Sequence, residues 1–128
     1  MPTFDAIGII ATDMAKTLAF YRQLGLEFPE GVESEGHVEA VLAGGFRVMF
    51  DSVEVVESFS TYEPPAGRRA VGFAFRCDSP SDVDATFEAV TGAGYEAKEQ
   101  PFDAPWGQRY ATVLDPDGNP VDLYAPLE

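Results

Sequence analysis

The sequence predicts an α+β fold built from two β-α-β-β-β modules. Two segments, one in each half of the 128-residue chain, have the apolar spacing of a helix with one buried face. Segments with the two-residue period of β-strands surround both helices. The halves repeat the same order of elements, and an internal repeat of this kind constrains the fold more than any single motif does.

The first half begins with a strand pattern at residues 7–11, which leads into the first helix. Asp13 is suited to cap that helix, because its carboxylate can accept hydrogen bonds from backbone N–H groups. Gly25 supplies a permissive end. The apolar face of the helix carries Met14, Leu18, Tyr21 and Leu24. Strand patterns follow at residues 38–42 and 46–50, with two glycines between them as a turn.

The second half repeats this order. A strand pattern at residues 70–77 precedes Ser79, a predicted N-cap, and Pro80, which suits the first position of a helix. The apolar face of this helix carries Val83, Phe87 and Val90. Strand patterns at residues 109–114 and 120–124 then flank a turn with the sequence DPDG.

These patterns predict one domain with two modules and a linker. The boundaries are residues 1–128 for the domain, about 4–52 for module one, about 53–67 for the linker and about 68–128 for module two. In the linker, Phe59 and Tyr62 either anchor the loop or close over a ligand as a lid. Arg68 and Arg69 are expected to be solvated charges at the start of the next strand.

Composition excludes several classes of protein. The chain has 22 acidic residues against 8 Lys plus Arg, a net charge of −14, which repels phosphate backbones and argues against a nucleic-acid partner. One Cys cannot form an internal disulfide, and one Cys with one His cannot make a four-coordinate zinc site. No apolar run has the length of a signal peptide or membrane span, so we expect a cytoplasmic protein with no membrane partner.

Three motifs resemble the vicinal oxygen chelate superfamily of glyoxalases, bleomycin-resistance proteins and extradiol dioxygenases. The opening motif is ATD at residues 11–13 followed by FYRQLGL at 20–26, and the closing motif is DPDGNPVDL at 115–123. The run PWGQR at 105–109 is similar to a segment of the bleomycin-resistance-like, antibiotic-binding branch. The resemblance implies paired modules whose sheets curl around a cleft. In that branch two chains form the clefts together, which implies a homodimer.

The same resemblance allows a test for a metal site. Metal-dependent members of the superfamily place ligands, usually His and Glu, on the first and last strands of each module. Overlaying the modules puts Ala6, Ala70, Val48 and Asp122 at these positions. Only Asp122 carries an oxygen, whereas a catalytic site needs about three protein ligands. We therefore expect no metal and no other cofactor.

Strand alternation suggests which residues face the cleft. In the first strand, Ile7 and Ile9 are expected against a helix and Ala6, Gly8 and Ile10 toward the cleft. Phe46, Val48 and Phe50 are expected to form an apolar wall of the cleft.

Aromatic and polar side chains near the last two strands complete the predicted site. Trp106, beside a glycine in a loop predicted at residues 100–106, can stack on a planar ligand or attract a cation. Asp122 can fix polar atoms of a ligand. His37, the only imidazole, is either a surface residue or an acid–base group. The predicted ligand contacts are Trp106, Phe46, Phe50, Tyr110, Phe102, Asp122, Tyr124, Phe59, Tyr62 and His37.

We therefore expect a non-catalytic protein that confers resistance by sequestering a toxic natural product of the bleomycin, mitomycin or polycyclic enediyne type. The ligand is expected to be aromatic and either cationic or neutral. Two alternatives remain open. One is a metal-free, glyoxalase-like lyase or isomerase that uses Asp122 or His37 as a general base on a small carbonyl compound. The other is a protein that binds a flavin or another aromatic metabolite.

Overall fold

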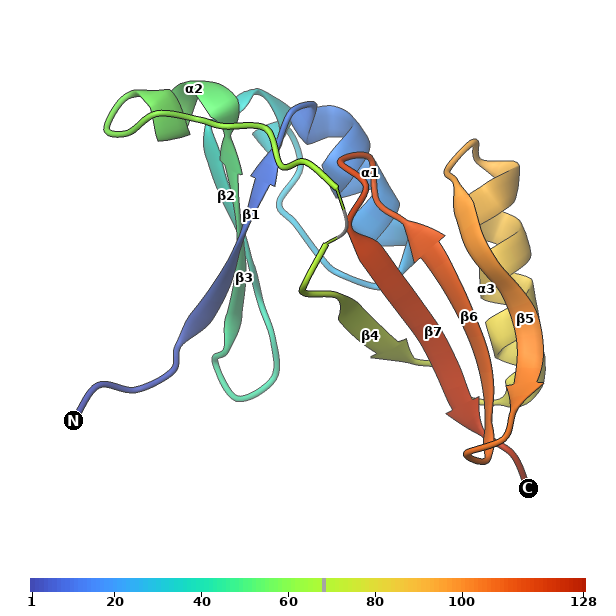
Figure 1. Cartoon of the computed structure of the whole chain (residues 1–128). Helices are drawn as coiled ribbons and strands as arrows, with labels where there is room; N and C mark the ends of the chain where they lie inside the picture. Colours follow the sequence, from blue (N-terminus) through green and yellow to red (C-terminus); the bar gives the residue numbers. More distant parts are fainter. Residues whose placement is uncertain (68) are drawn as a thin grey trace. The chain divides into compact units, whose positions relative to one another are not determined.

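The computed structural model describes residues 1–67 and 69–128, which form two compact units, residues 1–64 and 65–128. Each unit is a mixed β-sheet with a helix on one side (Figure 1), so the predicted α+β class is confirmed. Arg68, expected to be a solvated charge, lies outside the described residues. In the described part of the chain, every helix is too short or too polar to cross a membrane.

The first unit contains a three-stranded sheet. Its elements are β1 (Ala6–Ala11), α1 (Met14–Gln23), the short 3-10 helix η1 (Val32–Ser34), β2 (His37–Val41), β3 (Arg47–Ser52) and α2 (Val53–Glu57). The strand order is β1-β3-β2, with β1 parallel and β2 antiparallel to β3. The Asp13 side chain caps α1, as predicted, by accepting a hydrogen bond from the backbone N–H of Lys16 at 3.1 Å. The predicted linker begins with a helix, α2.

The first unit lacks the strand that we predicted directly after its helix. Residues 24–31 instead run to η1 without pairing to a strand. Arg22 holds this segment: its guanidinium donates to the Pro29 carbonyl at 3.4 Å and forms an ion pair with Glu33 at 2.9 Å. The same group lies over the ring of Phe28, 5.4 Å from its centroid. These contacts with the helix replace the backbone pairing of a strand.

The second unit contains a four-stranded sheet. Its elements are β4 (Phe73–Arg76), α3 (Pro80–Gly92), β5 (Ala97–Ala104), β6 (Gln108–Leu114) and β7 (Pro120–Pro126). The strand order is β4-β7-β6-β5, with β4 parallel to β7 and the other pairs antiparallel. Ser79 caps α3 and Pro80 begins it, as predicted.

Three details of the second unit differ from the sequence-based expectations. Most of the predicted loop at 100–106 belongs to β5. Strand β4 starts at Phe73 rather than at Ala70, because the next pairing position on β7 is Pro120, which has no N–H to donate. Arg69, expected to be solvated, is half-buried and donates to the carbonyl of Asp117 at 2.5 Å and to Asn119 Oδ1 at 3.4 Å.

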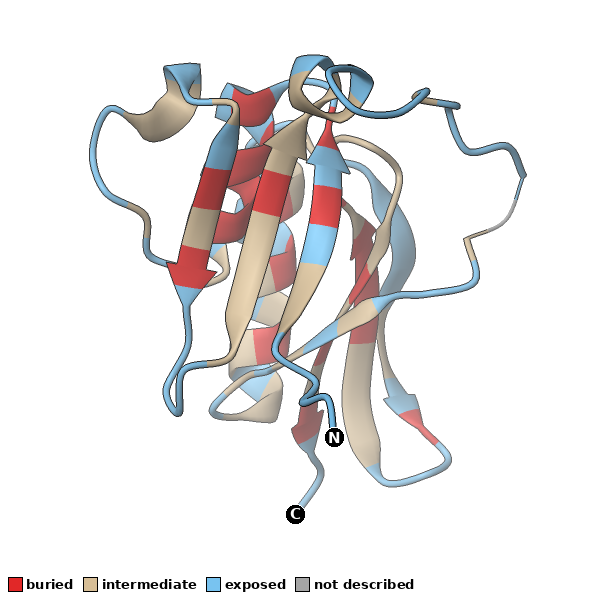
Figure 2. Cartoon of the chain, turned by 90° about the vertical axis from the view of Figure 1, so that its left-hand side faces the viewer, coloured by how far each residue is buried: buried red, intermediate tan, exposed pale blue. Residues whose placement is uncertain are grey.

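Each sheet buries one side against its helix. In the first unit, the fully buried ring of Phe50 packs on Tyr21 of α1 and on Phe28, with centroid distances of 5.3 and 5.4 Å. Figure 2 shows buried positions alternating with less buried ones along β1 and β2, and a single buried position in β3, with α1 behind the strands. In the second unit, Val121 and Leu123 of β7 are fully buried on the side that α3 covers. We call the other side of each sheet its open face.

The predicted apolar wall of Phe46, Val48 and Phe50 is wrong. Phe50 pairs with the buried residues Ile9 and Val38, so Phe50 and Val48 face the helix rather than the open face. Phe46 lies before β3, and its ring packs on Phe4 at a centroid distance of 5.2 Å. The expectation for β1 is correct, because Ile9 is buried whereas Gly8 and Ile10 are exposed.

The error comes from a one-residue shift in the overlay of the two modules. The structure makes Asp13 and Ser79 the equivalent helix caps, whereas the sequence overlay placed Val48 opposite Asp122. A shift of one residue exchanges the two sides of a strand. With the caps aligned, the open-face equivalent of Asp122 is Met49 rather than Val48.

Thr17 of α1 carries a buried hydroxyl that has no hydrogen-bond partner among the residues that the structure describes. A buried polar group left unpaired costs about 1–3 kcal/mol. Replacing Thr17 with valine keeps the shape of the side chain and removes this cost. We expect T17V to raise the free energy of unfolding by about 1 kcal/mol in urea denaturation. T17S, which keeps the hydroxyl and loses the methyl group, should lower it; equal values for the two variants would contradict this assignment.

Candidate functional site

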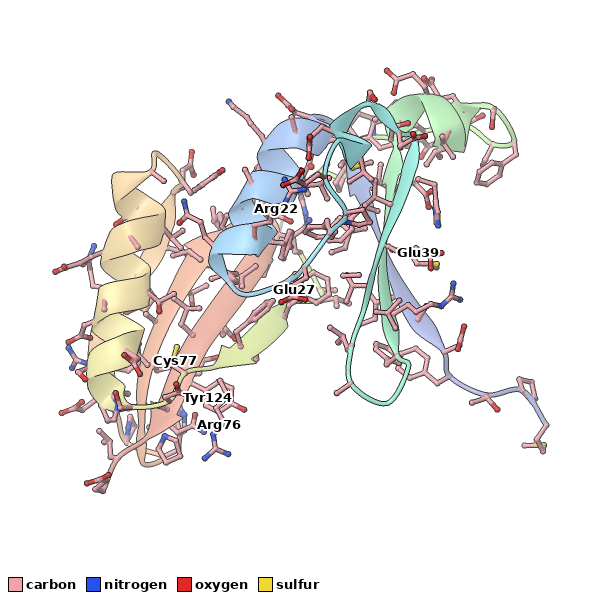
Figure 3. The ribbon with its side chains drawn as sticks, turned by 180° about the vertical axis from the view of Figure 1, so that it is seen from behind. Arg22, Glu27, Glu39, Arg76, Cys77 and Tyr124 are labelled. Atoms are coloured by element: carbon pink, nitrogen blue, oxygen red, sulfur yellow. The ribbon has the colours of Figure 1, made fainter. Side chains whose placement is uncertain are left out.

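Two rows of side chains cross the open face of the second sheet. Residues paired directly across neighbouring strands point to the same side. One row contains Arg76, Tyr124, Tyr110 and Phe102. The adjacent row contains Ala74, Asp122, Thr112 and Glu99. Figure 3 labels Arg76 and Tyr124, which lie side by side at the β4 end of the first row. The fold thus brings four of the predicted ligand contacts onto one surface of one unit.

Trp106, in the turn between β5 and β6, joins two of these residues in an aromatic cluster. Its ring centroid lies 5.4 Å from that of Tyr110 and 6.1 Å from that of Phe102, and all three pairs of rings meet edge to face. The indole N–H donates to Gln108 Oε1 at 3.0 Å, which fixes the ring. Trp106 is 60% exposed, so this oriented ring offers much of its surface to a ligand.

Two hydroxyl groups hold Asp122 at the centre of the open face. Thr112 donates to Oδ1 of Asp122 at 2.8 Å, and the Tyr110 hydroxyl donates to Oδ2. Burial and then the hydrogen bond to Asp122 raise the pKa of Tyr110 to about 12, so the phenol keeps its proton and remains a donor. Tyr110 therefore links the aromatic cluster to the carboxylate.

Five residues of this surface were not among the predicted ligand contacts: Ala74, Arg76, Glu99, Gln108 and Thr112. Thr112 and Gln108 lie on β6 at alternate positions with Tyr110, and strand alternation alone was a sufficient signal to find them. Arg76 was missed although it lies in the strand predicted at residues 70–77, on the same side as Ala74. Its exposed guanidinium has no hydrogen bond or ion pair within the part of the chain that the structure describes.

The opposite side of β6 is fixed to the helix by Arg109. Its guanidinium forms a two-pronged ion pair with Asp84 of α3, at 2.9 and 3.2 Å, and a further bond with Asp103 of β5 at 3.2 Å. Planar, paired contacts of this kind fix geometry better than a single bond does. Arg109 therefore fixes β6, the strand that carries Tyr110 and Thr112, on the side opposite its open face.

The open face of the first sheet carries a network of charges instead of the predicted apolar wall. His37 lies between Asp51, at 2.6 Å from Nδ1, and Glu39, at 2.7 Å from Nε2. Arg47 donates to both oxygens of Glu39 at 3.0 Å and to Asp5 at 2.5 Å. His37 is thus a member of an ion-pair network.

This network shifts the pKa values of His37 and Glu39 in opposite directions. Hydrogen bonds to Glu39 and then to Asp51 raise the pKa of His37 above its ordinary value of 6.5. The bond from His37, followed by that from Arg47, lowers the pKa of Glu39 below 4.5. Both shifts favour the charged forms. Each ring nitrogen of His37 faces a carboxylate oxygen, which only accepts hydrogen bonds, so the geometry favours the imidazolium, which has no lone pair with which to accept a proton.

These shifts predict how stability changes with pH. The raised pKa of His37 gives stability that is complete below about pH 6.5 and is lost as the pH rises through the folded-state value. The lowered pKa of Glu39 gives stability that is lost as the pH falls below about 4.5. The difference in Tm between wild type and H37Q should therefore be largest between these limits and shrink toward alkaline pH. R22Q breaks an ion pair that contains no histidine, so its difference in Tm from wild type should stay constant toward alkaline pH. If the difference for H37Q also stayed constant, the raised pKa of His37 would be contradicted.

The remaining predicted contacts lie elsewhere on the first unit. Phe59 follows α2 and is 75% exposed, so it anchors nothing within that unit, and Tyr62 is half-buried. Phe50 belongs to the core and Phe46 packs on Phe4.

The residues within each unit do not fit a catalytic metal. In residues 1–67 and 69–128, no three His, Cys, Asp or Glu side chains are grouped so that they could hold an ion. The structural equivalents on the open faces are Gly8, Met49, Ala74 and Asp122. Of these only Asp122 is a good oxygen donor, and both of its oxygens already accept hydrogen bonds.

Comparison with known proteins agrees with this fold. A family model described as the glyoxalase/bleomycin resistance protein/dioxygenase superfamily matches residues 3–123. A search of curated proteins found no match. A family enzyme of the same description from Burkholderia phytofirmans PsJN is 22% identical, with a TM-score of 0.79 over 98% of this chain and 100% of its own. The solution structure of protein ATC0852 from Agrobacterium tumefaciens is 26% identical, with a TM-score of 0.72 and complete coverage of both chains. A glyoxalase/dioxygenase from Nostoc punctiforme is 19% identical, with a TM-score of 0.71 over 98% of this chain and 92% of its own.

Proposed function

The chain belongs to the glyoxalase/bleomycin resistance protein/dioxygenase superfamily, and on that premise we propose that it binds an aromatic small molecule on the open face of its second unit without transforming it. The ligand is a toxic natural product of the bleomycin, mitomycin or polycyclic enediyne type, which the protein sequesters in the cytoplasm. As in the antibiotic-binding branch that residues 105–109 resemble, we propose that the protein acts as a homodimer.

The observation that supports this function is the exposed, oriented ring of Trp106 beside Tyr110 and Phe102. Aromatic rings that are fixed in place lose little entropy when a planar ligand stacks on them. The hydrogen bond to Gln108 and the ring contacts provide that fixation before a ligand arrives. Sequestration requires affinity and no reactive group, which suits a surface of rings, hydroxyls and carboxylates.

The contacts of His37 argue against this residue as the base in the alternative of a metal-free enzyme. A general base needs a free lone pair directed at the proton it removes. His37 is held as an imidazolium by two carboxylates. Asp122 accepts one hydrogen bond on each oxygen and keeps further lone pairs, so the chemical form of the ligand after binding decides between a base and a binding group at this residue. A flavin or another aromatic metabolite would use the same rings, and ligand titration distinguishes these compounds from drugs.

Fluorescence of Trp106 tests the proposal directly, because this is the only tryptophan of the chain. We expect bleomycin, mitomycin C or a polycyclic enediyne to quench its emission in a saturable manner. By calorimetry, W106A should bind the same compound about tenfold more weakly, because one stacking contact is lost. F4A, which removes another exposed ring from the first unit, should bind like wild type. Unchanged emission with all three drugs, or equal affinities of W106A and wild type, would reject the stacking role.

Drug challenge tests the biological role. A sensitive bacterium that expresses the protein should survive a higher dose of the quenching compound, and expression of W106A should give less protection. Protein recovered from the cells should release the drug chemically unaltered. Release of a modified drug would instead favour the enzyme, and protection against none of the three would reject sequestration.

A further inference from the structure

We infer that the ligand of this open face carries a positive charge and that Asp122 binds it. The inference rests on the proposed function and specifies its ligand as a planar aromatic compound with a protonated amine or amidine group. The structural basis is a carboxylate that is held in place by neutral donors and is not neutralised.

The partners of Asp122 leave its charge uncompensated. Its hydrogen bonds come from the hydroxyls of Thr112 and Tyr110, and no ion pair involves Asp122 among the residues that the structure describes. Arg22, Arg47 and Arg109, in contrast, each pair with at least one carboxylate. A carboxylate oxygen can accept more than one hydrogen bond. Asp122 can therefore accept a hydrogen bond from an N–H of a ligand and keep those from Thr112 and Tyr110.

The surroundings of Asp122 favour an organic cation. The Tyr110 ring contacts Trp106, while its hydroxyl binds Asp122, so a single side chain separates the exposed ring from the carboxylate. Adjacent rows of one sheet face are about 7 Å apart along a strand. A ligand with its rings against Trp106 can therefore extend an amine to Asp122. Aromatic faces also attract cations by about 0.5–2 kcal/mol.

Charge elsewhere in the molecule acts in the same direction. A net charge of −14 raises the local concentration of cations and has no such effect on neutral compounds. The cation on this face is Arg76, which lies one row from Asp122 and is exposed. Its charge is therefore screened by water and salt, whereas Asp122 is half-buried and less screened.

A matched pair of probes tests the inference on wild-type protein. At pH 7.5, 9-aminoacridine is a cation, whereas acridine has the same fused rings and is neutral. We expect 9-aminoacridine to bind about tenfold more tightly than acridine, because it gains one charge-assisted hydrogen bond. Equal affinities would overturn the inference and leave the stacking surface intact. Binding of neither probe would reject the stacking surface and the inference together.

Two variants then locate the charge that is responsible. D122N should lower the affinity for 9-aminoacridine about tenfold and leave that for acridine unchanged. D103N removes the same unit of charge from the opposite side of the sheet, where Asp103 pairs with Arg109, and should affect neither probe. Equal losses in D122N and D103N would mean that the overall field attracts the cation, which overturns a direct role for Asp122. Should D122N not fold, the probe comparison on wild type still decides the result.

Discussion

Replacing Phe50 with alanine is expected to lower the free energy of unfolding of the first unit by about 3–5 kcal/mol. The ring is fully buried and contacts Tyr21 and Phe28, so its removal leaves a cavity in addition to the lost transfer free energy. Phe50 also pairs with Ile9 and Val38 in the middle of the sheet, where the backbone cannot easily collapse into the space. Urea denaturation monitored by far-UV circular dichroism measures the loss.

The matched control is F59A, which removes the same ring from a position that is 75% exposed. A substitution of this kind changes stability by less than about 0.5 kcal/mol. A small effect of F50A would restore the interpretation of Phe50 as a wall of the binding site. F50A should retain ligand affinity at temperatures where the protein is folded, because its ring lies on the helix side of the first sheet.

Replacing Asp115 with alanine is expected to cost about 3 kcal/mol in the second unit. This buried carboxylate organises the turn between β6 and β7. Its Oδ1 accepts from the backbone N–H groups of Asp117 and Asn119, at 3.0 and 2.9 Å, and its Oδ2 accepts from the Asn119 side chain at 2.8 Å. Alanine would leave these donors without their acceptor. Thermal unfolding followed by circular dichroism measures the change.

The D115N variant separates the contribution of the Oδ1 hydrogen bonds from that of the Oδ2 hydrogen bond. Asparagine keeps the Oδ1 acceptor for the two backbone groups and loses the bond to the Asn119 side chain, so we expect a smaller loss than for D115A. A D115A protein as stable as wild type would show that the turn closes without the carboxylate. The hydrogen bonds of Asp115 would then not explain why this turn has the sequence DPDGN.

Local signals of helix ends were read correctly from the sequence, because a cap involves neighbouring residues only. Asp13 and Ser79 each accept a hydrogen bond from the residue three positions ahead, as their types predict. Strand β5 was missed because its pairing with β6 is irregular: the register shifts twice between Ala97 and Phe102, and Pro101 interrupts the pattern. Pairing across a bulge depends on the partner strand and leaves no regular period in the sequence.

The sequence predicted the candidate residues on the open face of the second sheet, but it assigned the wrong side of β3 to the open face of the first sheet. The predicted strands supplied the side and the order of Tyr110 and Asp122, whereas Phe102 and Trp106 were assigned to a loop and were selected by residue type alone. For β3 the helix-facing side was assigned to the site, since apolar residues alternate in the same way whichever side is buried. The charged face of His37 and Glu39 became recognisable only from their mutual distances, which no sequence period encodes.

Strand β6 assigns its two sides to separate tasks, and this makes the protein a scaffold for directed evolution. Arg109, Ala111 and Val113 hold the strand to the helix and the core, whereas Gln108, Tyr110 and Thr112 alternate with them on the open face. A library that randomises the second set leaves every core contact of the first unchanged. New ligand preferences are therefore accessible at these positions without reselecting for folding at each step.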